Sequence, residues 1–263
     1  MKRGVFFIKK NIVEENFFAF CRYLGRLNSS CTPTDSIVAM STGVPVSDMN
    51  WVYNESPLNH NTTDAVAEIK KFFEKSNLRF WWWVYPVAQS PESDRILKDA
   101  GFRLYVKITC MAADLHDALS GDNSPENIKI ISVKNKHELL AWKDVSFSGF
   151  EIPNRGKKQY ERFVLSFDLN AKSPQKLFIA YFDEKPVATS MLFVHENTAG
   201  IYYVSTLPDH RKKGCGLKIT QAAMKEAKNA GFQDVILQAT PMGVPVYKKA
   251  GFREYCQAHI YKL

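Results

Sequence analysis

The most restrictive feature of this sequence is a short motif that occurs twice. Residues 100–105 read Ala-Gly-Phe-Arg-Leu-Tyr, and residues 250–255 read Ala-Gly-Phe-Arg-Glu-Tyr. In both copies a helix-like stretch comes before the glycine and an alternating, strand-like stretch follows it, as expected when glycine ends a helix. A motif repeated in the same local context is typical of a duplicated structural unit. With 263 residues, the chain is long enough for two domains.

The boundary between the two units is predicted near residue 125. Residues 117–127 read DALSGDNSPEN, a composition rich in Gly, Ser, Pro, Asn and Asp that is typical of an exposed linker. We therefore divide the chain into residues 1–125 and 126–263. The net charge of +8 lies in the second part, which holds 21 Lys and Arg against 13 Asp and Glu, whereas the first part holds 14 of each. A basic excess suits a polyphosphate ligand, nucleic acid or an anionic membrane equally well.

The second part has the pattern of an α/β domain with a mixed sheet. Short turns separate three neighbouring apolar stretches, which predicts an antiparallel meander. A helix with one face of small residues follows the meander, and two more strands enclose a short helix. The predicted strands cover residues 128–133, 177–182, 187–195, 199–206, 235–239 and 254–262, and the predicted helices cover residues 135–150, 156–169, 214–230 and 244–250.

A basic, glycine-containing loop joins the strand at 199–206 to the helix at 214–230. It reads Arg-Lys-Lys-Gly-Cys-Gly over residues 211–216. Two glycines allow a ligand to approach the backbone closely, and the free N–H groups at a helix start attract an anion. The loop lacks the Walker pattern, and Ile219 occupies the place of the third glycine of a dinucleotide fingerprint. A different pyrophosphate carrier is therefore implied, unless the loop is only a basic turn that caps the helix.

The order of these features resembles the signature of the GNAT superfamily of N-acetyltransferases. A strand, Pro208, an R-x-x-G-x-G loop, a helix, a strand and the sequence Pro-Val-Tyr-Lys-Lys-Ala-Gly-Phe at residues 245–252 follow one another. The resemblance covers residues 128–263. It implies two tandem GNAT-like domains, each a mostly antiparallel mixed sheet flanked by helices.

The resemblance also implies the site residues. The R-x-x-G-x-G loop would cradle the pyrophosphate of coenzyme A, and two splayed strands would hold the pantetheine arm, with a backbone N–H as oxyanion donor. A tyrosine would protonate the departing thiolate, since a phenol pKa of about 10 lies near that of an alkyl thiol. The residues at these positions are, for the loop, Arg211, Lys212, Lys213, Gly214, Cys215, Gly216 and Leu217, for the strands, Val204, Ser205, Thr206, Gln238 and Ala239, and for the proton donor, Tyr247.

We expect an N-acetyltransferase that moves an acetyl group from acetyl-CoA to a primary amine by direct attack in a ternary complex. The acceptor would be an amine-bearing small molecule or a protein or peptide. The alternative is a non-catalytic acyl-CoA-binding sensor or scaffold. No metal is expected, and no nucleic-acid recognition signature accompanies the basic clusters. The acceptor and the oligomeric state stay open.

The general base is not identified by the sequence. Residues 201–205 carry no Glu or Asp, although relatives often have one on this strand, and Asp209 lies too close to the loop. Substitutes are His195, Glu196, Glu151, a water chain, or an amine that arrives already neutral. Cys215 at a helix start among cations is expected to have a lowered pKa, but it occupies a variable position of the motif.

The first part resembles a degenerate GNAT-like domain over residues 37–110. The expected elements are strands at 37–40, 51–54 and 80–85 and helices at 63–75 and 94–100. Residues 55–63, in the place of the phosphate loop, contain no basic residue and no glycine, so we expect a supporting domain. Trp81, Trp82 and Trp83 alternate sides in a strand, so we interpret them as core residues and not as a binding platform.

The cellular setting is predicted to be the cytoplasm. The apolar runs are far shorter than the roughly 18 residues of a membrane span, and residues 1–10 lack the apolar core of a secretory signal. The five cysteines are widely spaced without a CxxC pair, which favours reduced thiols.

Overall fold

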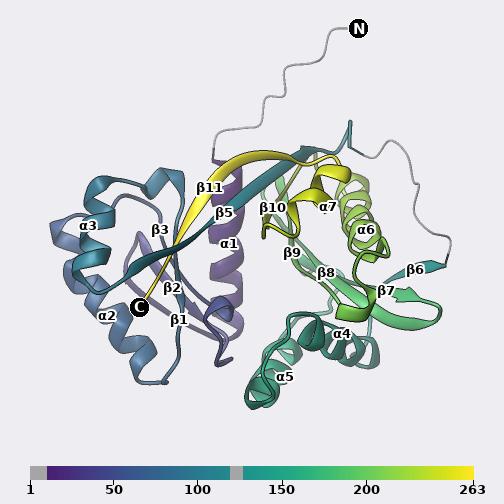
Figure 1. Cartoon of the computed structure of the whole chain (residues 1–263), viewed down its shortest axis with the longest axis horizontal. Helices are drawn as coiled ribbons and strands as arrows, with labels where there is room; N and C mark the ends of the chain where they lie inside the picture. The colour runs from purple at the N-terminus through teal and green to yellow at the C-terminus, as the bar shows by residue number, and fades with distance from the viewer. Residues whose placement is uncertain (1–10, 119–126) are drawn as a thin grey trace, which may run out of the picture. The chain divides into compact units, whose positions relative to one another are not determined.

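The computed structural model of the chain describes residues 11–118 and 127–263 (Figure 1). The predicted mixed α/β fold is confirmed: helices flank a mixed sheet. The helices are α1 Ile12–Leu27, α2 Thr63–Glu74, α3 Pro91–Asp99, α4 Lys136–Gly149, α5 Lys157–Leu165, α6 Cys215–Asn229 and α7 Val244–Lys249. The strands are β1 Ser29–Thr34, β2 Ile37–Ser41, β3 Asn50–Asn54, β4 Trp81–Val84, β5 Arg103–Asp114, β6 Ile128–Ser132, β7 Gln175–Phe182, β8 Lys185–His195, β9 Thr198–Thr206, β10 Asp234–Ala239 and β11 Arg253–Lys262.

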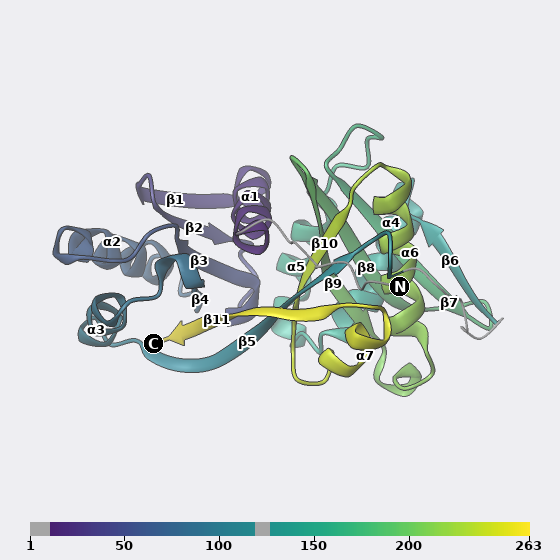
Figure 2. The same cartoon turned by 90° about the horizontal axis from the view of Figure 1, so that it is seen from above.

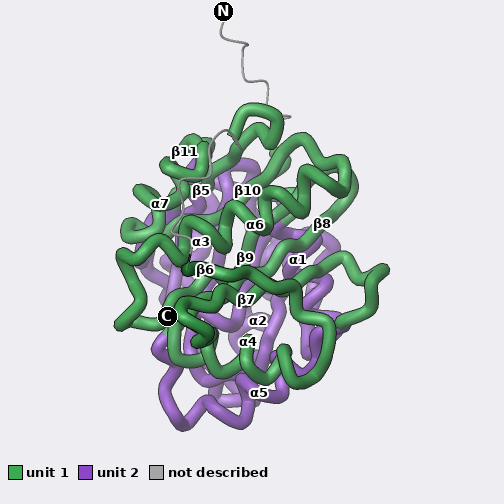
Figure 3. Tube along the Cα trace, turned by 90° about the vertical axis from the view of Figure 1, so that its right-hand side faces the viewer, with its two compact units in different colours: residues 1–16, 109–150, 169–255 green, residues 17–108, 151–168, 256–263 purple. Residues whose placement is uncertain are grey.

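The described chain forms two compact units whose sequence ranges interleave (Figure 3). Unit 1 contains Met1–Asn16, Thr109–Phe150 and Leu169–Tyr255, and unit 2 contains Phe17–Ile108, Glu151–Asp168 and Cys256–Leu263. The predicted boundary near residue 125 lies outside the described residues. The division into domains at residues 1–125 and 126–263 therefore stays a prediction.

In unit 1 the sheet has the order β5-β10-β9-β8-β7-β6. All neighbours are antiparallel except β9 and β10, which are parallel. The parallel pair is connected through α6, which packs on β8 and β9. Its buried face combines the small residues Ala223 and Ala227 with the larger Ile219 and Met224. Small side chains let the helix approach the sheet closely, as the sequence pattern predicts.

In unit 2 the same arrangement occurs with shorter strands. The order is β1-β2-β3-β4-β11, and only β3 and β4 are parallel. Trp82 is fully buried and Trp83 is 6% exposed, and the Trp82 indole donates a hydrogen bond to Asn54 Oδ1. These two indoles are core residues, as predicted, while Trp81 is half-buried.

The repeated motif marks the starts of two long strands that exchange partners. Gly101 and Gly251 both adopt left-handed conformations, with φ of 92° and 96°, and end α3 and α7. β5, which follows α3, pairs with β10 through residues 109–114. β11, which follows α7, pairs with β4 through residues 259–261. Figure 2 shows β5 in teal and β11 in yellow, each running from one unit into the other.

The sequence analysis makes no assignment for residues 11–34, where the structure has α1 and β1. α1 is amphipathic only in part, because Ile12, Val13, Glu14 and Asn16 are all buried near its start. All five cysteines are free thiols. Within residues 11–118 and 127–263, no helix is long and apolar enough to cross a membrane, and no group of three or more His, Cys, Asp or Glu is placed to hold a metal ion.

Candidate active site

A β-bulge bends β9 at Tyr203 and Val204. The register with β8 runs from Met191 opposite Tyr202 to Thr189 opposite Ser205, so Ser190 faces two residues of β9. Tyr203 lies in this bulge and has a φ of 49°, in the left-handed region. A bulge of this kind increases the local bend and redirects the following residues.

β9 and β10 separate after Gly200, three residues before Tyr203. Their parallel pairing covers only Thr198 with Asp234, Ala199 with Val235 and Ile236 with Gly200. In the described part of the chain, no pair joins residues 201–206 to residues 237–239. The other edge of β10 stays paired with β5 as far as Ala239. Val204, Ser205 and Thr206 of β9 and Gln238 and Ala239 of β10 all lie beyond the last pair of these strands. Their role in holding a pantetheine arm stays a prediction.

The loop after β9 ends in a glycine that starts α6. Gly214 has a φ of 87° and is the N-cap of α6, which has no side-chain cap. The first N–H groups of the helix therefore lack the usual side-chain acceptor, and the helix dipole makes this end electropositive. Lys212 and Lys213 are exposed beside it. This end of α6 can accept an anion, and its role in binding a pyrophosphate stays a prediction.

Arg211 also fixes the position of the loop. Its Nη2 donates to the Gly149 carbonyl at 3.1 Å and its Nε donates to the Thr206 carbonyl at 3.3 Å. Gly149 is the last residue of α4, where a cation is favourable for the helix dipole. Part of the Arg211 donor capacity is thus already used to join the loop, β9 and α4, which the motif alone does not reveal.

Ser205 and Thr206 of β9 each lie against a glycine at the end of a helix. Gly149 lies against Ser205: a Cβ at Gly149 would come within 2.7 Å of Ser205 Oγ. On the other face, a Cβ at Gly216 of α6 would lie 3.5 Å from Thr206 Oγ1, an ordinary contact distance. Alternation along the strand directs Ser205 and Thr206 to opposite sides. The sequence analysis missed Gly149, whose only signal is a glycine within a helix.

Replacing Gly149 by alanine is expected to destabilise unit 1. The added methyl group would overlap Ser205, whose hydroxyl is 2.7 Å from that of Thr189, so α4 must shift or the hydroxyl pair must break. Overpacking of this kind costs about 1–3 kcal/mol. Urea unfolding should show this loss for Gly149→Ala and little change for Gly216→Ala. Equal stability of the two variants would contradict the close contact.

Gln238 carries a buried donor at the splayed gap. Its Nε2 is buried and has no hydrogen-bond partner among the described residues. Val235, Leu237 and Ala239 belong to the core that contacts α6 and α7, so alternation places Gln238 on the opposite face. A buried donor without a partner costs about 1–3 kcal/mol, which is recovered when a ligand supplies an acceptor.

Tyr247 lies in α7 within the unit 1 core. Its ring packs at the edge of Phe252, with 6.0 Å between ring centroids, and against Gly243. Burial raises the pKa of Tyr247 to about 12. The phenol is therefore a weaker acid than the reference value used in the sequence analysis suggests.

The expectation for Cys215 is wrong. Its thiol is buried, and this burial raises its pKa even though its own backbone N–H and the nearby Lys213 act in the opposite direction. Desolvation of the thiolate outweighs the charges around it. Cys215 contributes to the core beneath α6.

The candidate bases occupy different places. His195 and Glu196 form the exposed hairpin between β8 and β9. At roughly 3.3 Å per residue, this hairpin is separated from Ser205 by almost the whole of β9. Asp209 lies in the short turn Pro208–His210, next to the loop. Glu151 follows α4 with a φ of 54° and is exposed.

Comparison with known proteins assigns this region to a family. Residues 138–252 match the model of the acetyltransferase (GNAT) family. The uncharacterized N-acetyltransferase YjcF of Bacillus subtilis (strain 168) is 33% identical over 75 residues, which are 28% of this chain and 54% of that protein. The chain thus matches only about half the length of this curated relative.

Solved structures share the fold over most of the chain. A GCN5-related N-acetyltransferase from Kribbella flavida is 17% identical with a TM-score of 0.73, covering 97% of this chain and 96% of its own. A tandem GNAT protein from the clavulanic acid biosynthesis pathway is 14% identical with a TM-score of 0.55, covering 87% and 78%. At these identities the likeness concerns the fold alone. The GNAT family model thus matches residues 138–252, less than half of the chain, and the solved GNAT structures share its fold.

Proposed function

We propose that this protein is an N-acetyltransferase that moves an acetyl group from acetyl-CoA to a primary amine. The observation that carries the proposal is the junction of two features: the splayed gap between β9 and β10 opens where the uncapped N-terminus of α6 begins. A long ligand with a pyrophosphate at one point and an amide-rich arm at another fits such a junction. The match of residues 138–252 to the acetyltransferase (GNAT) family supports acetyl transfer as the reaction class.

The residues present fit coenzyme A. Its pyrophosphate would accept hydrogen bonds from the first N–H groups of α6, at Cys215, Gly216 and Leu217, with the charges of Lys212 and Lys213 nearby. The pantetheine amides would pair with free backbone groups of residues 204–206 and 238–239. The buried Gln238 Nε2 would gain an acceptor from a carbonyl of the ligand.

The chemistry required is a direct attack on the thioester. The amine nitrogen forms a bond to the acetyl carbon, the carbon–sulfur bond breaks, and the amine loses a proton while the thiolate gains one. A backbone N–H at the bulge, as at Val204, would stabilise the oxyanion. Tyr247 would donate its phenolic hydrogen toward the departing sulfur. The base is open, and an acceptor amine that arrives neutral needs none.

Two glycines at opposite ends of α6 provide a matched test of the phosphate site. Gly214 and Gly231 have φ values of 87° and 91°, so alanine at either position costs about 1–2 kcal/mol of backbone strain. Only Gly214 lies at the N-terminus of the helix. Calorimetry should show at least tenfold weaker coenzyme A binding for Gly214→Ala and unchanged binding for Gly231→Ala. Equal affinities would place the pyrophosphate elsewhere.

The alternative is a non-catalytic acyl-CoA sensor, favoured by the absence of a carboxylate from residues 201–205 of β9. A panel of amines, including polyamines, aminoglycosides, amino acids and peptide N-termini, separates the two proposals when release of free coenzyme A is measured. An enzyme gives amine-dependent release from at least one compound. A sensor binds acetyl-CoA and releases none above the buffer rate.

A further inference from the structure

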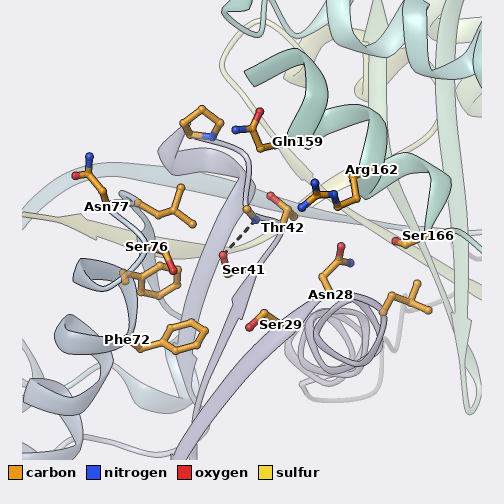
Figure 4. A pocket seen from close by; sticks show the side chains of 15 residues that line it. Asn28, Ser29, Ser41, Thr42, Phe72, Ser76, Asn77, Gln159, Arg162 and Ser166 are labelled. Carbon is orange, nitrogen blue, oxygen red and sulfur yellow. Dashed lines mark hydrogen bonds between the residues drawn. The ribbon is translucent and has the colours of Figure 1, made fainter. Parts of the chain in front are cut away.

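Unit 2 contains a cavity of about 510 Å³ that the acetyl-transfer proposal does not use (Figure 4). Its walls are the end of α1 with the start of β1, the turn after β2, the end of α2, and one face of α5. This volume lies within the range of small-molecule sites in proteins. Most of the side chains around it are hydroxyls or amides.

Among the described residues, Arg162 of α5 is the single charged residue that lines the cavity, and no carboxylate of residues 11–118 or 127–263 does so. The Arg162 guanidinium has no ion pair or hydrogen bond with any residue that the structure describes, and Figure 4 shows it directed toward Thr42. A guanidinium suits a planar carboxylate, which accepts two parallel hydrogen bonds from it. The cavity thus favours a ligand with an anionic group.

Gln159 provides the complementary group. Its Oε1 is buried and accepts no hydrogen bond from the described part of the chain. Gln159 and Arg162 are three residues apart on α5 and so lie on one face, with Cβ atoms about 5–6 Å apart. The unpaired Gln159 Oε1 beside the Arg162 guanidinium favours a ligand in which a hydrogen-bond donor lies next to a carboxylate. The hydroxyls of Ser41 and Thr42 are less available, because both are bonded to Asn50.

We propose that this cavity is a binding site for a free α-amino acid. Its carboxylate pairs with Arg162, its ammonium donates to Gln159 Oε1, and its side chain lies toward the apolar wall that Phe72 supplies at the end of α2. In an α-amino acid the two charged groups are separated by one carbon, which matches neighbouring side chains on one helix face. The site is independent of the proposed coenzyme A site, whose residues all belong to unit 1.

The test is calorimetric titration of the full chain, without acetyl-CoA, with each of the twenty amino acids. We expect at least one to bind, and its decarboxylated and deaminated analogues to bind at least tenfold more weakly. Arg162→Gln and Gln159→Leu should each weaken binding at least tenfold. Lys158→Gln is the matched control, because it removes an exposed positive charge from the same helix outside this cavity and should leave binding unchanged.

The outcomes test amino-acid binding in this cavity independently of the proposed acetyl transfer. If no amino acid binds, or if Arg162→Gln binds as tightly as the parent chain, the proposal is wrong. Ser76→Trp places a large side chain in the lining of the cavity. This variant tests the site without changing its charge and should also abolish binding. Acetyl-CoA affinity should be the same in all four variants, so a failure of acetyl transfer leaves this result untouched.

Discussion

A fragment of residues 126–263 is expected not to fold, although it contains the whole segment that matches the GNAT family. The fragment lacks β5, whose residues 109–114 pair with β10 along its full length. Met111, Ala113 and Leu115 are completely buried in the core that also contains α6 and Tyr247. Their loss exposes apolar surface and leaves the edge of β10 unpaired, which favours aggregation. We expect an insoluble fragment or one without a cooperative unfolding transition.

Coexpression tests whether β5 is the missing element. Residues 1–118 should restore a soluble complex with residues 127–263, because β5 pairs with β10 and β11 pairs with β4. Residues 1–102 form the matched control, since they differ only by the segment that contains β5, and they should not restore it. A fragment of residues 126–263 that unfolds cooperatively on its own would show that strand exchange is dispensable for unit 1.

The basic, glycine-containing loop at the start of α6 could be predicted from the sequence because its residues are adjacent, whereas its ligand stays a prediction. Gly214 and the three basic residues before it lie next to one another in the chain, and any helix that starts there presents its N–H groups. The splayed gap was expected only from the family resemblance. The bulge at Tyr203 lies within the separated part of β9, and nothing in residues 201–206 marks Tyr203 as left-handed.

The strand exchange could not be predicted because it depends on which strands pair at long range. The repeated motif indicates a duplication but does not say that β5 completes the sheet of the other copy. The roles of Gly149 and the Arg211 side chain are missed for the same reason, since each acts through a partner more than 50 residues away. The wrong expectation for the Cys215 thiol arose because sequence shows nearby charges but not burial.

Tyr247→Phe is expected to lower the turnover of acetyl transfer by about 10²-fold or more, the usual effect of removing one hydrogen-bond donor that stabilises a developing negative charge. The ring remains, so its packing against Phe252 and Gly243 is kept. The KM for acetyl-CoA should change little, because the hydroxyl acts on the departing sulfur. Steady-state kinetics with the best amine from the panel measures both parameters. Phe252→Leu is the control, since it loosens the same packing but keeps the hydroxyl.

The pH profile of acetyl transfer should show no titration of Tyr247 in the working range. Burial raises the pKa of Tyr247 to about 12, above the ordinary value of about 10, so the phenol keeps its proton at every pH from 6 to 10. The rate should therefore rise as the acceptor amine loses its proton, and no fall due to Tyr247 should follow below about pH 11. A thiol of ordinary pKa near 8.5 is a stronger acid than this phenol, so Tyr247 stabilises the thiolate mainly as a hydrogen-bond donor. If the turnover of Tyr247→Phe stays within threefold of the parent rate across this range, Tyr247 does not assist the departing thiolate, and solvent supplies its proton.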